Sequence, residues 1–120
     1  MLSHRIRGRL LTLTVKGRYS PDERDAFLDT IGADPAVPSR AVLMIDIREL
    51  EFNPAVGDGL RALIARIGPK LGTVCAVVAS DARWKLAQEF QRAASSQQLR
   101  VVVFRDEASA RDWLAPLLRG

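Results

Sequence analysis

Cysteine, histidine and aromatic residues are scarce in this chain of 120 residues. It has one cysteine, Cys75, and one histidine, His4, while Phe, Trp and Tyr together make up 6% of it. A single cysteine excludes an intramolecular disulfide and a cysteine-based metal cluster. Nucleophilic catalysis needs a base within hydrogen-bond reach of a Ser or Cys, and no serine lies in a nucleophile-elbow pattern. We therefore expect no catalytic residue, no cofactor and no metal, with His4 a solvated strand residue and Cys75 a small core residue.

Long apolar runs are also absent. The longest, such as residues 74–79, are far shorter than the roughly 20 residues that a bilayer requires. The first ten residues carry charge but no apolar segment of signal-peptide length. The sequence therefore predicts no membrane partner and favours a cytoplasmic protein.

The bulk composition is that of a globular protein. Hydrophobic residues make up 48% of the chain and charged residues 27%. A length of 120 residues suits one domain spanning 1–120, which can bury enough surface to fold without cross-links.

Basic residues are concentrated at the start of the chain. The net charge is +4, but residues 1–20 alone carry +5, with no acidic residue among them. A basic patch attracts phosphates or acidic partners. No aromatic residues are interleaved with these charges, so we expect a solvated strand face and regard nucleic acid as an unlikely partner.

The pattern of residues alternates between strands and helices. Residues 2–17 read as a β-hairpin turning near Gly8 and Arg9, with Arg5, Arg7, Thr12, Thr14 and Lys16 on an outer face. Three apolar runs, at 41–47, 73–79 and 99–104, are typical of strands covered on both faces. Helices are predicted over 21–32, 58–67 and 81–94 and from 107 onward.

Several residues predict where these helices begin and end. Ser20 and Glu23 form a capping box, and Asp58, Asp81 and Asp106 are expected as helix caps. Gly32 is expected to end the first helix, and Pro116 to end or distort the last turn of the fourth, in which Leu117 is expected to face inward. The predicted fold is α/β, with a mixed five-stranded sheet, antiparallel in its N-terminal hairpin and otherwise parallel, and four helices.

Residues 42–64, VLMIDIRELEFNPAVGDGLRALI, resemble the signature region of STAS domains, the fold of anti-sigma-factor antagonists. The segment 101–114 resembles the last strand and helix of a SpoIIAA-like subgroup, described as STAS-like or CRAL-TRIO-like. The matching positions are a strand-end Asp, two apolar turn residues, a helix-entry Gly and a pair of helix leucines: Asp46, Leu50, Phe52, Gly57 or Gly59, Leu60 and Leu63. The resemblance implies a domain that acts by binding a protein partner or itself as a homodimer.

One departure from the STAS pattern limits what the resemblance implies. Regulatory antagonists carry a phosphorylatable Ser or Thr at the start of this helix, but residues 51–72 contain neither. The phosphoryl switch is therefore not carried over. Asp58 could act there as a permanent anion, and its ordinary role as a helix cap is the alternative.

Five residues are candidate binding residues: Asp46, Asn53, Asp58, Asp81 and Trp84. Asp46, Asp81 and Asp106 each follow a predicted parallel strand, and three converging carboxylates could hold Mg²⁺. The alternative, which we favour, is that they cap helices and turns. Trp84 lies off the buried stripe of its helix and either forms a dimer or partner surface or packs on the preceding loop.

Three hypotheses about function follow. The first is a non-enzymatic domain that binds a protein partner or itself. The second is a carrier of a small apolar ligand or lipid, although a domain this small is expected to have little volume to spare. The third is a metal-dependent enzyme that uses the acidic strand ends.

Overall fold

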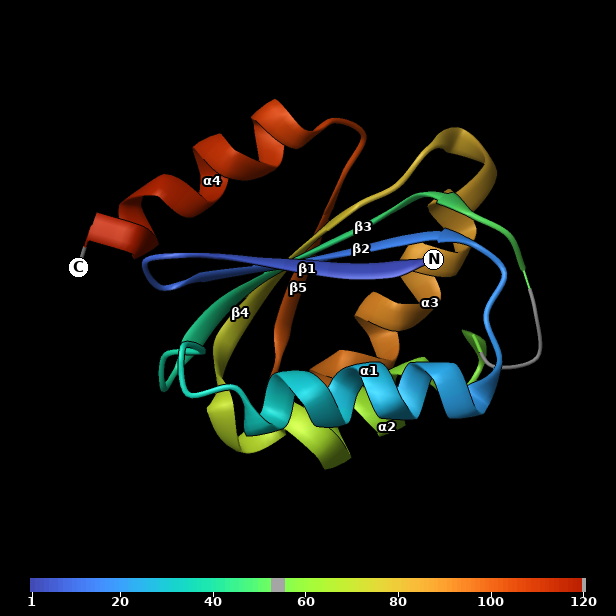
Figure 1. Ribbon diagram of the computed structural model, residues 1–120. Coiled ribbons are helices and arrows are strands. Elements are labelled where there is room, and N and C mark those ends of the chain that lie inside the picture. The colour runs from blue at the N-terminus through green and yellow to red at the C-terminus, as the bar shows by residue number, and fades with distance from the viewer. Residues whose placement is uncertain (53–55, 120) are drawn as a thin grey trace.

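The computed structural model describes residues 1–52 and 56–119. Its strands and helices alternate after an initial hairpin, as the sequence predicts (Figure 1). In chain order they are β1 (Leu2–Arg7), β2 (Leu10–Gly17), α1 (Pro21–Ala33), β3 (Ala41–Leu50), α2 (Gly59–Ile67), β4 (Leu71–Val78), α3 (Trp84–Ser95), β5 (Arg100–Phe104) and α4 (Glu107–Arg119). Two 3₁₀ turns, η2 (Gly68–Lys70) and η3 (Asp81–Arg83), precede β4 and α3.

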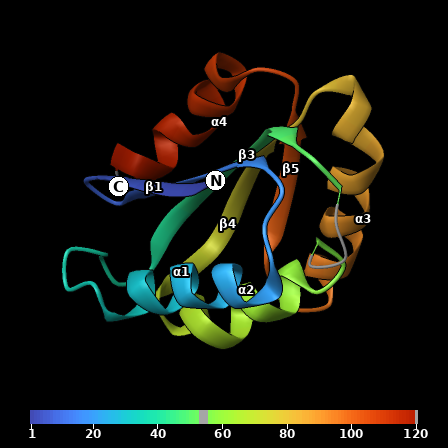
Figure 2. The same ribbon diagram turned by 45° about the vertical axis from the view of Figure 1, so that its right-hand side comes forward.

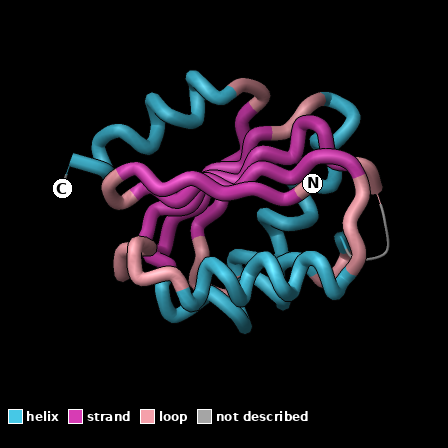
Figure 3. The backbone as a smooth tube through the Cα atoms, in the orientation of Figure 1, coloured by secondary structure: helices cyan, strands magenta, loops and turns pink. Residues whose placement is uncertain are grey.

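The strands form one sheet, drawn in magenta in Figure 3. The order of its five strands is β1-β2-β3-β4-β5. β1 and β2 pair antiparallel, and the remaining neighbours pair parallel. The two-residue turn between β1 and β2 needs a left-handed backbone at Gly8, whose φ is 57°. The predicted mixed sheet and the predicted hairpin are both confirmed.

The helices cover the two faces of the sheet unequally. α1, α2 and α3 lie on one face, and α4 lies on the other (Figures 1 and 2). Because β2, β3, β4 and β5 follow one another across the sheet, crossovers of one hand place the three connecting helices on the same face. α4 follows the last strand and is free to fold back over β3, β4 and β5.

The core has one part on each face of the sheet. Side chains alternate along β3, so that Leu43 and Ile45 pack with α1 and α2 while Met44 packs with α4. The larger part also includes Leu11, Ile31 and other buried residues of the three-helix face. No helix within the described residues has the length and apolar character that crossing a bilayer would need.

Two of the four predicted helix caps form as expected. The Ser20 hydroxyl accepts a hydrogen bond from the Glu23 backbone N–H at 3.1 Å, and the Asp106 carboxylate accepts one from the Ser109 N–H at 2.7 Å. Asp58 occupies the N-cap position of α2 without a side-chain cap hydrogen bond. The prediction for Asp81 is wrong, because a 3₁₀ turn begins there and α3 starts only at Trp84.

The predicted helix ends also need correction. Gly32 lies inside α1, which continues to Ala33. A Cβ atom at Gly32 would lie 3.0 Å from the Arg66 carbonyl oxygen, so this glycine permits the close approach of α1 and α2. Pro116 does not end α4, which continues to Arg119. That Pro116 distorts the last turn stays a prediction. Leu117, expected to face inward, is exposed.

Candidate functional site

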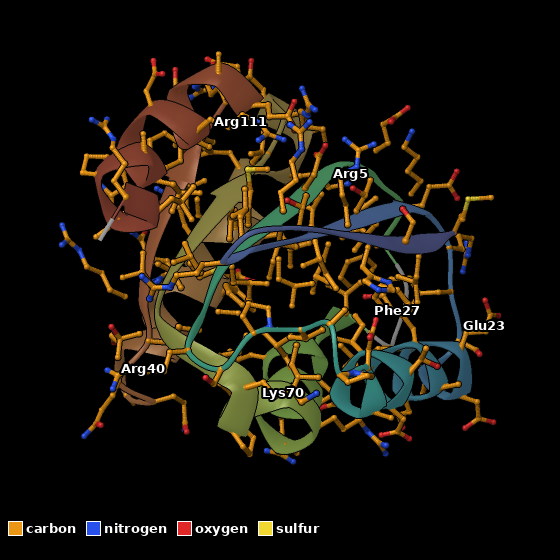
Figure 4. All side chains as sticks on the ribbon, turned by 60° about the vertical axis from the view of Figure 1, so that its left-hand side comes forward. Arg5, Glu23, Phe27, Arg40, Lys70 and Arg111 are labelled. Atoms are coloured by element: carbon orange, nitrogen blue, oxygen red, sulfur yellow. The ribbon has the colours of Figure 1, made fainter. Side chains whose placement is uncertain are left out.

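A pocket of about 360 Å³ lies between the sheet and the helices α1, α2 and α3, which cover one face of the sheet, called here the three-helix face. The strand residues that line it come from the start of β1 and from the middle and carboxyl-terminal parts of β2, β3 and β4. The carboxyl-terminal edge of the parallel strands is where α/β proteins bind ligands. α1, α2 and α3 form the remaining walls, and Phe27 of α1 points toward the sheet (Figure 4). Most lining residues are aliphatic or aromatic: Leu2, Leu13, Val15, Tyr19, Phe27, Leu28, Ile45, Ile47, Leu50, Val56, Leu60, Leu63, Val77, Leu86, Phe90 and Ala93.

Strand periodicity explains the apolar floor of the pocket. Leu13 and Val15 on β2 are two residues apart and point to the same face, as do Ile45 and Ile47 on β3. These positions continue the buried stripe that packs under α1 and α2 nearer the other end of the strands. The helices do not fill the space above the strand ends, so the same apolar face becomes a pocket there.

Few polar side chains line this pocket: Tyr19, Arg24 and Glu89. The side chain of Arg24 is only 12% exposed, and its Nε donates a hydrogen bond to Asp25 Oδ1 at 3.0 Å. Burial raises the pKa of Tyr19, although the positive charge of Arg24 acts in the opposite direction. Glu89 lies on α3 and is exposed.

An ion-pair network joins the two helices beside the pocket. Arg66 of α2 donates hydrogen bonds to both Asp29 oxygens at 2.6 Å, and its Nη2 lies 3.3 Å from Asp25 Oδ2. The hydrogen bonds to Asp29 raise the pKa of Arg66. Asp25 is therefore shared by Arg24 and Arg66, and the network fixes α1 against α2.

Asp46 lies on the sheet face opposite the pocket. It pairs with Thr14, and its neighbour Met44 packs under α4. The Asp46 carboxylate accepts two hydrogen bonds from the Arg48 guanidinium, at 3.0 and 2.8 Å, and one from the Arg48 backbone N–H at 3.0 Å. Burial acts to raise the pKa of Asp46, but the bonds and charge of Arg48 lower it overall. Its observed role is to hold Arg48.

Asp81 and Trp84 both contact Arg105, which follows β5. The guanidinium forms an ion pair with Asp81, and its Cζ lies 4.3 Å from the centroid of the Trp84 ring. Trp84 is half-buried, and its contacts are with Arg105 and with the core under α1, α2 and α3. That it packs on the preceding loop stays a prediction. That Trp84 also forms a dimer or partner surface stays a prediction. An unchanged oligomer mass and unchanged partners for Trp84→Ala in analytical ultracentrifugation would count against it.

The three strand-end aspartates therefore engage different partners: Arg48, Arg105 and Ser109. Within residues 1–52 and 56–119, no group of three His, Cys, Asp or Glu side chains is arranged to hold a metal ion. Asp58 is exposed and does not line the pocket, although its neighbours Gly57 and Gly59 do. Asn53 lies outside the described residues.

His4 and Cys75 are the residues best suited to nucleophilic chemistry. Both make packing contacts in the fold. Cys75 is completely buried, as expected, and burial raises the pKa of its thiol. His4 is half-buried rather than solvated: its Nε2 lies 3.8 Å from Asp34 Oδ2, and its ring meets Phe27 edge-on. The expectation of a solvated His4 is wrong because β1 packs beside α1.

None of the predicted binding residues that the structure describes lines the pocket. Sequence reasoning concentrated on polar residues at strand ends, whereas the pocket is built from apolar ones. The available signal was the alternation of residues 13, 15, 45 and 47, together with Arg24 close to the apolar pair Phe27 and Leu28. Neither pattern predicts that α1, α2 and α3 leave the space above the strand ends unfilled.

The structure is similar to solved SpoIIAA-like proteins. An uncharacterised protein of the DUF3478 family from Shewanella loihica PV-4, with a SpoIIAA-like fold, is 20% identical and has a TM-score of 0.62 over 95% of this chain and 92% of the other. An anti-sigma factor antagonist from Mycobacterium paratuberculosis is 16% identical, with a TM-score of 0.56 over 100% and 94%.

No family model and no curated protein matches the sequence. At such low identity, the two structural similarities define the fold alone. That fold agrees with the predicted STAS resemblance in its mixed five-stranded sheet and its four helices. The chain has the SpoIIAA-like α/β fold.

Proposed function

We propose that this chain is a non-enzymatic SpoIIAA-like domain that binds a small apolar ligand in the pocket between the sheet and its three-helix face. The observation that carries the proposal is the pocket itself, about 360 Å³ in volume and lined mainly by apolar side chains. This volume lies near the lower end of the roughly 300–1,000 Å³ typical of small-molecule sites. It contradicts our expectation that a domain of this size has little volume to spare.

Two physical arguments favour a ligand over a packing defect. Protein interiors are close-packed and contain few voids larger than a water molecule. The pocket also lies at the carboxyl ends of the parallel strands, where the fold class binds ligands. A ligand that replaces water against these side chains gains the free energy of burying apolar surface.

The chemistry of the chain supports binding without reaction. Cys75 is buried in the core with a raised thiol pKa, so it is not a thiolate nucleophile. His4 contacts Asp34 and Phe27, and its ring does not line the pocket. The polar groups that do line it, from Tyr19, Arg24 and Glu89, are suited to orienting a ligand.

Titration with 1-octanol, followed by amide NMR shifts, tests this proposal. We expect saturable shifts in residues of the pocket walls. Leu60→Trp, which adds a ring to the pocket wall, should abolish them, whereas Leu117→Trp on exposed α4 should not. The absence of saturable binding to the wild-type chain, or equal binding to Leu60→Trp, would contradict the proposal.

A second candidate function is docking of an acidic protein partner on the outer face of the β1–β2 hairpin. Arg5 points away from α1 and α2 (Figure 4). It pairs with Thr12, and Arg7, two residues further along β1, lies on the same face and is exposed. α4 packs on β3, β4 and β5 and reaches the hairpin at its turn, where Arg9 Nη1 donates a hydrogen bond to the Leu117 carbonyl oxygen at 3.4 Å. The residues of this basic face include no aromatic side chain to stack a base, which favours a protein over a nucleic acid.

Charge reversal tests the second candidate. A partner captured by the wild-type chain is purified and titrated against Arg5→Glu/Arg7→Glu, with Arg92→Glu on the exposed surface of α3 as the control. We expect the hairpin variant alone to lose binding, and wild-type affinity to fall with added salt. Equal binding by both variants would contradict the proposal, and so would tighter binding of a mixed-sequence DNA duplex than of the partner.

A further inference from the structure

We infer that a second, smaller pocket at the amino-terminal ends of β3 and β4 is an anion site that takes one phosphate group. This pocket has a volume of about 140 Å³, and Arg9 and Arg40 both line it. It lies at the opposite end of the parallel strands from the apolar pocket, and the two share no lining residue among those described. The inference therefore does not depend on the apolar ligand.

The two arginines bring positive charge to this pocket without a matching carboxylate. Arg9 lies in the turn of the β1–β2 hairpin, and Arg40 immediately precedes β3 (Figure 4). Arg9 Nη1 donates a hydrogen bond to the Leu117 carbonyl oxygen at 3.4 Å, and neither arginine is in an ion pair within residues 1–52 and 56–119. Among the residues that the structure describes, no Asp or Glu lines the pocket. An anion that enters it meets two guanidiniums and no competing carboxylate from these walls.

The backbone of Arg40 is held in an unfavourable conformation beside this pocket. Its φ is 57°, in the left-handed region that residues with a Cβ atom rarely adopt. A Cβ atom at Gly72 would lie 3.1 Å from the Arg40 carbonyl oxygen and 3.3 Å from that of Ala41, so β4 packs directly against this turn. A strained conformation persists where its surroundings fix it, and such residues are concentrated at binding and active sites.

A β-bulge brings Thr73 to the same pocket. The register between β3 and β4 shifts after Ala41, so that residues 72–74 of β4 stand opposite Val42 alone. All of these residues line the pocket, and bulges of this kind re-aim side chains next to functional sites. Thr73 is exposed, and its hydroxyl is a further donor for an oxyanion. The arginines, the strained turn and the bulge therefore meet at one place.

The charges of this pocket favour a phosphate group over a carboxylate. Each guanidinium presents a planar fork of N–H donors, and two forks match the double charge and the several oxygens of a phosphate. A carboxylate has one charge and two oxygens, so one fork satisfies it. The volume is less than half that of the apolar pocket, which suits one such group with the rest of a larger ligand in solvent. Free phosphate and the phosphate of a small organic ester share this chemistry.

Titration with inorganic phosphate and with glycerol 1-phosphate, followed by amide NMR shifts at pH 7.5 and constant ionic strength, tests the inference. We expect saturable shifts at residues 9, 40 and 72–74 with both probes, and the tighter-binding one identifies the source of the phosphate. Acetate should bind about tenfold or more weakly, since it cannot satisfy both charged donors. Equal affinity for acetate and phosphate, or shifts that do not saturate, would overturn the inference.

Two variants and a matched control separate a site from general attraction by positive charge. Arg40→Asn removes the charge but keeps a residue that tolerates the left-handed backbone, and Arg9→Gln alters only the exposed hairpin turn. Each should weaken phosphate binding about tenfold or more without changing amide shifts away from the pocket. Arg18→Asn removes the same charge beyond the other end of β2 and should bind phosphate like the wild-type chain. Equal losses in all three variants would overturn the inference and leave the apolar-ligand proposal untouched.

Discussion

The Ser20 hydroxyl occupies the N-cap of α1, where it accepts the Glu23 backbone N–H at 3.1 Å. Without it, this helical N–H loses its protein partner. We expect Ser20→Ala to lower the free energy of unfolding by about 1 kcal/mol. The free energy of unfolding is measured by urea unfolding followed by circular dichroism. Ser96→Ala, which removes an exposed hydroxyl after α3, serves as the control and should cost less. Equal losses would contradict the capping role.

The hydrogen bonds of Asp106 lead us to expect that the stability of the fold depends on pH. Hydrogen bonds from the Ser109 backbone N–H and hydroxyl lower its pKa below the usual value. Because the pKa of Asp106 is lower in the folded chain than in the unfolded chain, its ionised carboxylate stabilises the fold fully above the unfolded-state pKa. This stabilisation is lost as pH falls through the folded-state pKa. The difference in Tm between the wild-type chain and Asp106→Ala should therefore shrink below about pH 4. A difference that stays constant from pH 7 to pH 2 would contradict this.

Close approach of two helices depends on Gly32. A Cβ atom there would lie 3.0 Å from the Arg66 carbonyl oxygen and 3.8 Å from Ile67 Cγ2. Since Arg66 is also held by Asp25 and Asp29, α2 has little freedom to move away. Gly32→Val should destabilise the fold by roughly 1–3 kcal/mol through overpacking.

Ala26→Val places the same side chain on the exposed side of the same helix and serves as the control. Valine has a lower helix propensity than alanine but a higher one than glycine, so propensity alone would not make Gly32→Val the less stable variant. Ala26→Val should cost only about 0.5 kcal/mol. Urea unfolding of both variants gives the comparison. If Gly32→Val is no less stable than Ala26→Val, the two helices can separate without loss, and the packing argument is wrong.

Ligand binding in the pocket should stabilise the whole molecule. The pocket walls come from β1, β2, β3, β4 and the three helices that cover them, so they exist only in the folded chain. A ligand that binds the folded chain alone raises the free energy of unfolding by about 2.7 kcal/mol at one hundred times its Kd. Differential scanning calorimetry with 1-octanol should show a rise in Tm, absent for Leu60→Trp. An equal rise in both proteins would point to binding elsewhere.

Local patterns in the sequence were sufficient for much of the fold. Alternation in residues 11–16 and the apolar run 41–47 predicted β2 and β3, and the helical spacing of Leu60, Leu63 and Ile67 predicted α2. These signals are strong because each depends only on residues within one element. Helix ends were less predictable: Asp81 has the side chain of a cap, yet its carboxylate pairs with Arg105, far along the chain.

Strand and helix periodicity are local properties, so most elements, their order and the apolar side of each strand could be predicted from the residues alone. That Leu13, Arg24, Ile45 and Leu60 surround one pocket could not be predicted in this way. The tertiary structure decided this, and it also decided that Asp46 faces the other side of the sheet. The reason is physical: a pocket exists where packed helices fail to fill the space over a sheet, and that depends on the positions of elements distant in sequence.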